Sequence, residues 1–233
     1  MIKDTTCIVR TIGERTTDIC CNRLASMGLD PLQITGKPFY RTLVNAYKKA
    51  IAYRNKYTIM VDADVIPTVT HIDDFIEFFI AGKYEMSMME IECFVFGCVR
   101  FGGIKIYKTS VLKENKSLLD SLSYRPEAAI NHILDNGRFG KCFGTHGYQQ
   151  YYQDIWHTFF FHGIKSKDNA KFKESMINMQ QKCILGKDKD TLVAYAAASA
   201  GGEYKNAYGY PEIDYKQFKL KEKEPMTQEE IST

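Results

Sequence analysis

The stretch YTIMVDADVIP, residues 57–67, decides how the rest of the chain is interpreted. Its first five residues are mostly apolar or β-branched and carry no charge, which predicts a strand buried on both faces. Asp62 and Asp64 follow at the end of that strand, and side chains two residues apart on an extended backbone project to the same side. Two carboxylates that close together repel one another unless a cation lies between them. Pro67 ends the pattern, because proline cannot donate to a sheet ladder.

The two aspartates have two interpretations. A hard divalent ion bound through oxygen, Mg²⁺ or Mn²⁺, is the simplest partner for the pair. An ordinary turn with two solvated aspartates is the alternative, because a single hydrophobic-Asp-x-Asp match is weak evidence. The sequence around the motif has to decide between a metal site and a turn.

Composition narrows the class of protein. The chain has 233 residues, of which 45% are hydrophobic and 25% charged, as expected for a soluble globular protein with a substantial core. A net charge of +3 argues against nucleic acid as the partner. No apolar run approaches the roughly 18 residues of a membrane span and no signal peptide is evident, so we expect a cytoplasmic protein. The seven cysteines contain no CxxC pair and indicate neither a disulfide framework nor a zinc site.

The segments before the motif alternate between strand and helix patterns. Strands are predicted over 5–11, 32–35 and 57–61, and helices over 17–27 and 40–52. A β-α-β-α-β order predicts an α/β fold with a mostly parallel central sheet flanked by helices. Ligands of such sheets bind outside the carboxyl ends of the strands, and residues 11–15 and 62–64 both lie at that edge.

The pattern after Pro67 is more varied. A helix is predicted over 71–81, strands over 86–96 and 103–107 with the Gly102-Gly103 pair between them, a helix opening at Arg125-Pro126-Glu127, and an aromatic helix over 148–162. The composition changes from Lys165. We therefore divide the chain into an α/β domain at 1–165, a helical extension at 166–215 and a charged tail at 216–233.

Four segments follow one another in the order that one known fold requires. They are CIVRTIGERT at 7–16, VDADVIP at 61–67, GGIKIY at 102–107 and HGYQQYY at 146–152. In this order they resemble glycosyltransferases of the Rossmann-like GT-A fold, most closely the family 2-like group. The resemblance implies an inverting, metal-dependent enzyme. Such an enzyme moves a sugar from a nucleotide-diphosphate donor to an acceptor hydroxyl, in glycan or polysaccharide synthesis.

The resemblance also implies roles for individual residues. Mn²⁺ or Mg²⁺, clamped by Asp62 and Asp64, would neutralise the charge on the departing diphosphate. The loop after the first strand would hold the nucleotide through Thr11, Gly13, Glu14 and Arg15. Arg41 steadies an aspartate or a phosphate, or is simply a solvated arginine on a helix. Gly102 and Gly103 let the backbone approach the donor sugar, or form a plain β-turn.

The third metal ligand and the catalytic base are harder to assign. His146 follows loop-like sequence and matches the place where GT-A enzymes often bring in a late histidine, whereas His162 stands in a compressed version of the His-x-x-Gly-x-x-Lys element of family 8. About 24 Å of helix would separate the two histidines, so at most one of them is the ligand. Glu127 matches the position of the family's base, although Ala128 replaces the second acid of the pair and a helix N-terminus favours acids in any case. Glu90 and Glu92 are the reserve candidates.

Other functions remain in competition. A haloacid-dehalogenase-type phosphohydrolase also places Asp-x-Asp after a buried strand, but on the first strand of the chain. A nucleotidyltransferase should have a glycine-rich loop where this chain has one glycine, and a non-catalytic module would keep nucleotide-sugar binding without turnover. The basic, partly apolar residues after Lys165 suit the inner face of an anionic membrane or a lipid-linked acceptor, or else cap the sheet or form a homodimer contact.

Overall fold

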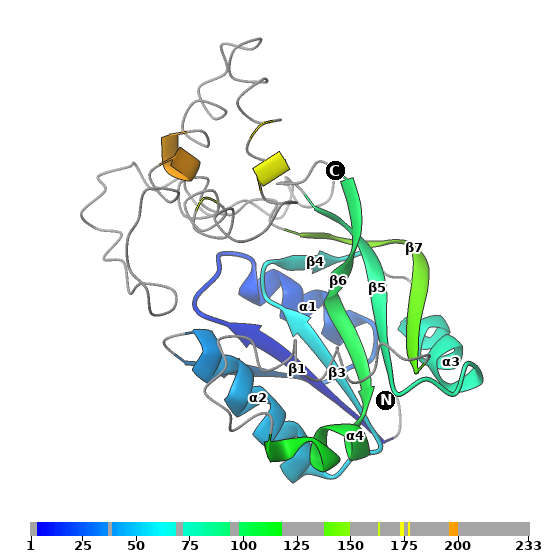
Figure 1. Cartoon of the computed structure of the whole chain (residues 1–233). Helices are drawn as coiled ribbons and strands as arrows, with labels where there is room; N and C mark the ends of the chain where they lie inside the picture. The colour runs from blue at the N-terminus through cyan, green and yellow to red at the C-terminus, as the bar shows by residue number, and fades with distance from the viewer. Residues whose placement is uncertain are drawn as a thin grey trace. The chain divides into compact units, whose positions relative to one another are not determined.

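Seven strands and four helices lie among the described residues around the predicted aspartates. The computed structural model describes residues 4–36, 39–68, 72–93, 98–117 and 138–149, together with 163, 173–174, 177 and 196–199. The chain divides into two compact units, Met1–Tyr151 and Tyr152–Thr233. The elements of the first unit are β1 Thr5–Thr11, α1 Thr17–Ser26, β2 Pro31–Thr35, α2 Phe39–Tyr53, β3 Tyr57–Asp62, β4 Val65–Pro67, α3 Ile72–Ala81, β5 Met86–Cys93, β6 Cys98–Lys108, α4 Thr109–Glu114 and β7 Phe139–Gln149 (Figure 1).

The strands form one sheet in the order β2-β1-β3-β6-β5-β7-β4. β1 pairs in parallel with both β2 and β3, which confirms the predicted β-α-β-α-β start. The prediction of a mostly parallel sheet is wrong, because β6 is antiparallel to both of its neighbours and β4 is antiparallel to β7. The sheet is therefore mixed. Only residues 94–97 separate β5 from β6, and a connection that short joins antiparallel neighbours, whereas a parallel pair needs a crossover of a dozen residues or more.

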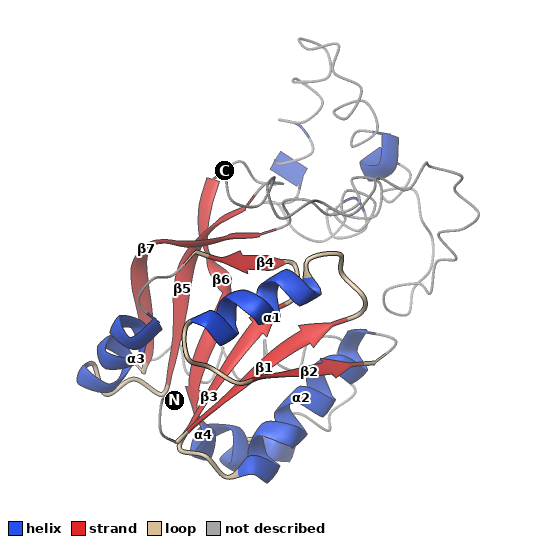
Figure 2. Ribbon diagram, turned by 180° about the vertical axis from the view of Figure 1, so that it is seen from behind, coloured by secondary structure: helices blue, strands red, loops and turns tan. Residues whose placement is uncertain are grey.

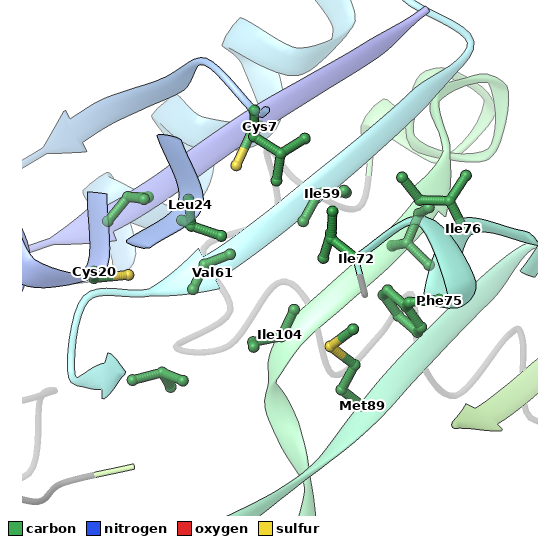
Figure 3. Close-up of a cluster of buried hydrophobic side chains, with 14 of the residues drawn as sticks. Cys7, Cys20, Leu24, Ile59, Val61, Ile72, Phe75, Ile76, Met89 and Ile104 are labelled. Atoms are coloured by element: carbon green, nitrogen blue, oxygen red, sulfur yellow. The ribbon is translucent and has the colours of Figure 1, made fainter. Parts of the chain in front are cut away.

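Helices cover both faces of the sheet. On one face, α1 and α3 pack Leu24 and Phe75 against Ile59 and Val61 of β3 (Figures 2 and 3). On the other face, α2 and α4 pack against side chains that include Met60 of the same strand. The prediction that β3 is buried on both faces is thus confirmed, since residues 57–61 are all buried.

The thiol of Cys7 belongs to the first of these clusters. Burial, with smaller contributions from Cys21 and Asp30, raises its pKa to about 12. It therefore stays protonated at neutral pH and packs as a small apolar side chain.

Three elements were not predicted, namely β4, α4 and β7. Residues 143–147 were interpreted as a loop leading to a helix, but they lie inside β7, and Tyr148 belongs to that strand. Gly140 and Gly147 weaken the strand pattern of this segment, because glycine is uncommon inside strands. Each allows a close approach: a Cβ would lie 2.3 Å from Ser87 Oγ at Gly140 and 3.0 Å from the Ile66 carbonyl oxygen at Gly147.

Some predictions fall outside the described residues. These are the helix that opens at Arg125, the rest of the aromatic segment, and most of the segment after Lys165, of which residues 196–199 are helical. The predicted boundaries at 165 and 215 stay predictions. Within the described part of the chain, no helix is long and apolar enough to cross a membrane.

Gly103 occupies a position in β6 that leaves no room for a side chain. Its φ is +68°, and a Cβ would lie 2.6 Å from Val65 Cγ2 and 2.7 Å from Ile91 Cδ1. We expect Gly103→Ala to lower the free energy of unfolding, measured in urea, by about 1–3 kcal/mol through overpacking, in addition to the backbone strain. Gly28→Ala is the matched control, because Gly28 has a φ of +82°, nearer to that of Gly103, and nothing lies within 4 Å of its Cβ position. Equal losses in the two variants would contradict the packing argument.

Candidate functional site

The carboxyl ends of β1 and β3 lie side by side and form the base of the site. Arg10 pairs with Asp62 in the parallel register. The amide of Ala63 donates to the Arg10 carbonyl oxygen at 3.0 Å, and Thr16 Oγ1 donates to the Ala63 carbonyl oxygen at 2.6 Å. These bonds join the residues just before α1 to the Asp62-Ala63-Asp64 turn, so the two segments predicted to meet at this edge do so.

Asp62 has a cationic partner within the protein. Arg10 Nη2 lies 2.5 Å from Asp62 Oδ1, and the exposed fractions of the two side chains are 1% and 25%. A buried guanidinium is costly unless it is paired, so the two residues hold each other in place. Arg10 was not among the residues predicted from the sequence. The available signal was a charged residue inside an otherwise apolar strand, in register with Asp62 of a neighbouring strand.

Asp64 is held by a different element. Ala63 and Asp64 form a turn between β3 and β4, so the extended geometry assumed for residues 62–64 does not apply. Gln149 Nε2 donates to Asp64 Oδ1 and Oδ2 at 3.2 and 3.3 Å. Gln149 is buried and stands opposite Val65 in the pairing of β7 with β4. No local sequence signal predicts this contact, because β7 itself was not predicted.

His146 lies elsewhere on β7. Its carbonyl oxygen accepts from the amide of Thr68, at the far end of β4 from Asp64. Its Nε2 is 3.0 Å from the Phe143 carbonyl oxygen and 3.6 Å from Cys142 Sγ. The structure therefore does not bring this side chain to the aspartates. Among the described residues, no group of three His, Cys, Asp or Glu side chains could hold a metal, and His162 and Glu127 lie outside them.

The loop after β1 is organised by Glu14. Its Oε2 accepts from Thr11 Oγ1 at 2.6 Å and from the amide of Ile12 at 2.7 Å. The amide of Gly13, whose φ is +102°, donates to Thr11 Oγ1 at 3.0 Å. Three of the four predicted nucleotide-binding residues thus form one hydrogen-bonded turn, and Arg15 is exposed beside them.

Glu14 should make stability depend on pH. Burial raises its pKa above the ordinary value of 4.5, and the nearby Asp62 charge acts in the same direction, although the bonds from Thr11 and Ile12 oppose the shift. The folded chain then holds the proton to higher pH than the unfolded chain. Stability from this group is present below about pH 4.5 and is lost as pH rises through the raised pKa.

Glu14→Gln tests this expectation, because glutamine accepts the same two hydrogen bonds and does not titrate. We expect the wild type to lose stability relative to this variant as pH rises, when both are unfolded in urea between about pH 4 and pH 8. A difference that is constant with pH, or that favours the wild type increasingly at higher pH, would contradict the shift.

The chain is similar in part to several solved structures. No family model and no curated protein matches the chain in sequence. A glycosyltransferase involved in the glycosylation of the major capsid of PBCV-1 aligns over 64% of this chain and 94% of its own, with a TM-score of 0.47 and 10% identity. S. aureus TarS 1-349 aligns over 84% of this chain and 70% of its own, with a TM-score of 0.45 and 10% identity. A cytidylyltransferase from Leptospira borgpetersenii serovar Hardjo-bovis aligns over 77% of this chain and 95% of its own, with a TM-score of 0.40 and 12% identity. The function proposed below rests on this chain's own residues.

The remaining predicted residues stand on β6, α2 and β5. Gly103 is next to the site, since a Cβ there would lie 3.7 Å from Gln149 Cδ, and Gly102 adjoins the Arg100 side chain. Both glycines stand inside β6 and not between two strands. Arg41 is exposed on α2. The reserve base Glu90 accepts from the amide of Gly144, and Glu92 lies two residues further along β5.

The donor set beside Asp64 suits a divalent cation. Asp62, Asp64 and Gln149 all carry side-chain oxygens, the ligand type that Mg²⁺ and Mn²⁺ prefer, and Gln149 presents Nε2 to Asp64 in this structure. Gln149 Oε1 is buried and has no hydrogen-bond partner among the described residues, so one oxygen of the set is still available. The residues present therefore fit such an ion.

Proposed function

We propose that this protein is a metal-dependent glycosyltransferase that moves a sugar from a nucleotide-diphosphate sugar to an acceptor hydroxyl. The observation that carries the proposal is the junction of the Thr11–Arg15 loop with the Asp62–Asp64 turn, through Thr16 and Arg10. It lies at the carboxyl ends of β1 and β3, where α/β sheets bind their ligands. The same two segments carry the sequence resemblance to GT-A enzymes.

The chain's residues have distinct parts in this proposal. A divalent cation, Mn²⁺ or Mg²⁺, supplies positive charge that stabilises the departing diphosphate when it is bound. Asp62 and Asp64 would hold it, with Arg10 fixing the position of Asp62. The turn built by Thr11, Gly13 and Glu14 faces the nucleotide. Glu127 takes the acceptor's proton in an inverting reaction, with Glu90 and Glu92 in reserve.

The acceptor side of the proposal rests on sequence alone. The basic and apolar residues after Lys165 suit a glycan or a lipid-linked acceptor at the inner face of a membrane, or a homodimer contact. We propose polysaccharide synthesis in the cytoplasm as the setting.

Calorimetric titration of UDP, GDP and dTDP with and without Mn²⁺ tests the proposal. We expect one of the three to bind, at least about tenfold more tightly with Mn²⁺ than in EDTA, because the ion bridges the carboxylates and the diphosphate. No binding under either condition would refute the proposal. Metal-dependent binding without hydrolysis or transfer of any donor would favour the non-catalytic module. Release of phosphate from simple phosphomonoesters would favour the phosphohydrolase, and formation of a nucleotide sugar from a nucleoside triphosphate would favour a nucleotidyltransferase.

A further inference from the structure

Gln149 is a buried polar residue that neighbouring strands hold in position. Its exposed fraction is 6%, and its backbone stands opposite Val65 of β4 on one side and Cys93 of β5 on the other. Gly103 of β6 adjoins its amide group, since a Cβ at Gly103 would lie in ordinary van der Waals contact with Gln149 Cδ, at 3.7 Å. The side chain therefore reaches Asp64, 85 residues away in sequence, from a rigid position.

The amide of Gln149 uses only half of its hydrogen-bonding capacity. Nε2 donates to both oxygens of Asp64 at 3.2 and 3.3 Å, which is long for a bond to a carboxylate, where about 2.7–2.9 Å is usual. Oε1 is buried without a hydrogen-bond partner among the described residues. A buried carbonyl without a partner is costly, because it has given up its hydrogen bonds to water, and buried polar groups in native proteins almost always have a partner.

Rotating the side-chain amide of Gln149 by half a turn about its last torsion exchanges the positions of Oε1 and Nε2. Oε1 then faces the carboxylate of Asp64, an arrangement that is repulsive unless a cation lies between the oxygens. The carboxylates of Asp62 and Asp64, two residues apart, supply negative charge that attracts such an ion. A neutral carbonyl oxygen is also a normal ligand for Mg²⁺ and Mn²⁺ in proteins.

We propose that Gln149 is the third protein ligand of the divalent cation, in the place that the sequence predicts for His146. This inference rests on the proposed function, because it concerns the same Asp62–Asp64 site. The side chain of His146 is directed to Cys142 and the Phe143 carbonyl oxygen, whereas Gln149 already contacts Asp64. Gln149 acts at the cation and not on the reacting sugar.

The experiment measures binding of Mn²⁺ alone to the full chain by electron paramagnetic resonance, with no nucleotide present. We expect Gln149→Leu to weaken Mn²⁺ binding by at least about tenfold, the usual effect of disturbing a metal's ligand environment. Gln149→Glu keeps an oxygen at the site and should bind Mn²⁺ at least as tightly as the wild type. His146→Ala is the matched control from the same strand, and its affinity should stay within about twofold of the wild type.

If Gln149 only stabilised the fold, Gln149→Leu would lower the melting temperature in EDTA as well as in Mn²⁺. A role as ligand predicts a different result. In EDTA, Gln149→Leu should melt close to the wild type, because removing a buried carbonyl without a partner offsets the loss of the long bonds from Nε2 to Asp64. What it should lose is the rise in melting temperature on adding Mn²⁺. If Gln149→Leu does not fold, Gln149→Asn, which withdraws the amide by one methylene, should show the same loss of Mn²⁺ affinity.

Two outcomes separate this inference from the proposed function. Wild-type Mn²⁺ affinity in Gln149→Leu or Gln149→Asn, together with lost affinity in Asp64→Asn, would overturn the role of Gln149 and leave the cation site standing. Unchanged affinity in Asp64→Asn, or no Mn²⁺ binding by the wild type, would overturn both.

Discussion

Asp64→Asn is expected to abolish sugar transfer while the chain stays folded. The substitution removes the negative charge of Asp64, yet asparagine still offers an oxygen to Gln149 Nε2. Loss of a charged group that stabilises a leaving group costs about 10²–10³ in rate, and loss of the ion it holds costs more. We therefore expect kcat/KM for donor hydrolysis and transfer to fall at least about 10³-fold.

Circular dichroism and thermal unfolding in EDTA provide the control for this variant. Both should match the wild type, because Asp64 stands in a turn and is only partly buried. Mn²⁺-dependent activity retained in Asp64→Asn would remove the basis for the proposed function. Asp62→Asn is the poorer test, because it also leaves the buried Arg10 without its carboxylate and so confounds activity with folding.

The first half of the fold was predictable because its signals are local. The apolar run before Asp62 and the helical spacing of apolar residues placed β1, β2, β3, α1, α2 and α3 within a few residues of their observed bounds. Each of these elements buries a face that its own sequence marks as apolar. The parallel pairing of β1 with β2 and β3 then follows from the alternation of strands and helices.

The second half depends on pairings that leave no local trace. β7 contains Gly140, Gly144 and Gly147, which weaken a strand prediction, and it forms because β5 and β4 pair with it from either side. Two consequences for the site follow from that single strand. It places Gln149 at Asp64, and it directs the side chain of His146 elsewhere.

The aspartate motif itself shows how residue types can be predicted without their environment. The sequence predicts two carboxylates at a strand end, and the structure has them there. It does not predict that Asp62 is neutralised by a buried arginine, because Arg10 precedes it by 52 residues and joins it only through the register of β1 and β3. The repulsion that the motif implied is thus relieved in part by the protein.

The Arg10–Asp62 pair should contribute strongly to the stability of this sheet, because the Arg10 side chain is buried. We expect Arg10→Met to lower the free energy of unfolding by about 3–5 kcal/mol, because it leaves Asp62 without its cation, close to Asp64 and Glu14. That is a large fraction of the roughly 5–15 kcal/mol that keeps a typical domain folded. Urea unfolding of the wild type and the variant measures the loss.

Arg138→Met is the matched control, because Arg138 also pairs with a carboxylate, Glu85, at 2.9 Å, but its side chain is 63% exposed. Its loss should be within about 1 kcal/mol, as for other surface ion pairs. The double variant with Arg10→Met and Asp62→Asn should be more stable than the sum of the single losses predicts, since neither partner is then left charged and alone. Equal losses in Arg10→Met and Arg138→Met, or simple additivity in the double variant, would show that the buried pair does not hold Asp62 in place.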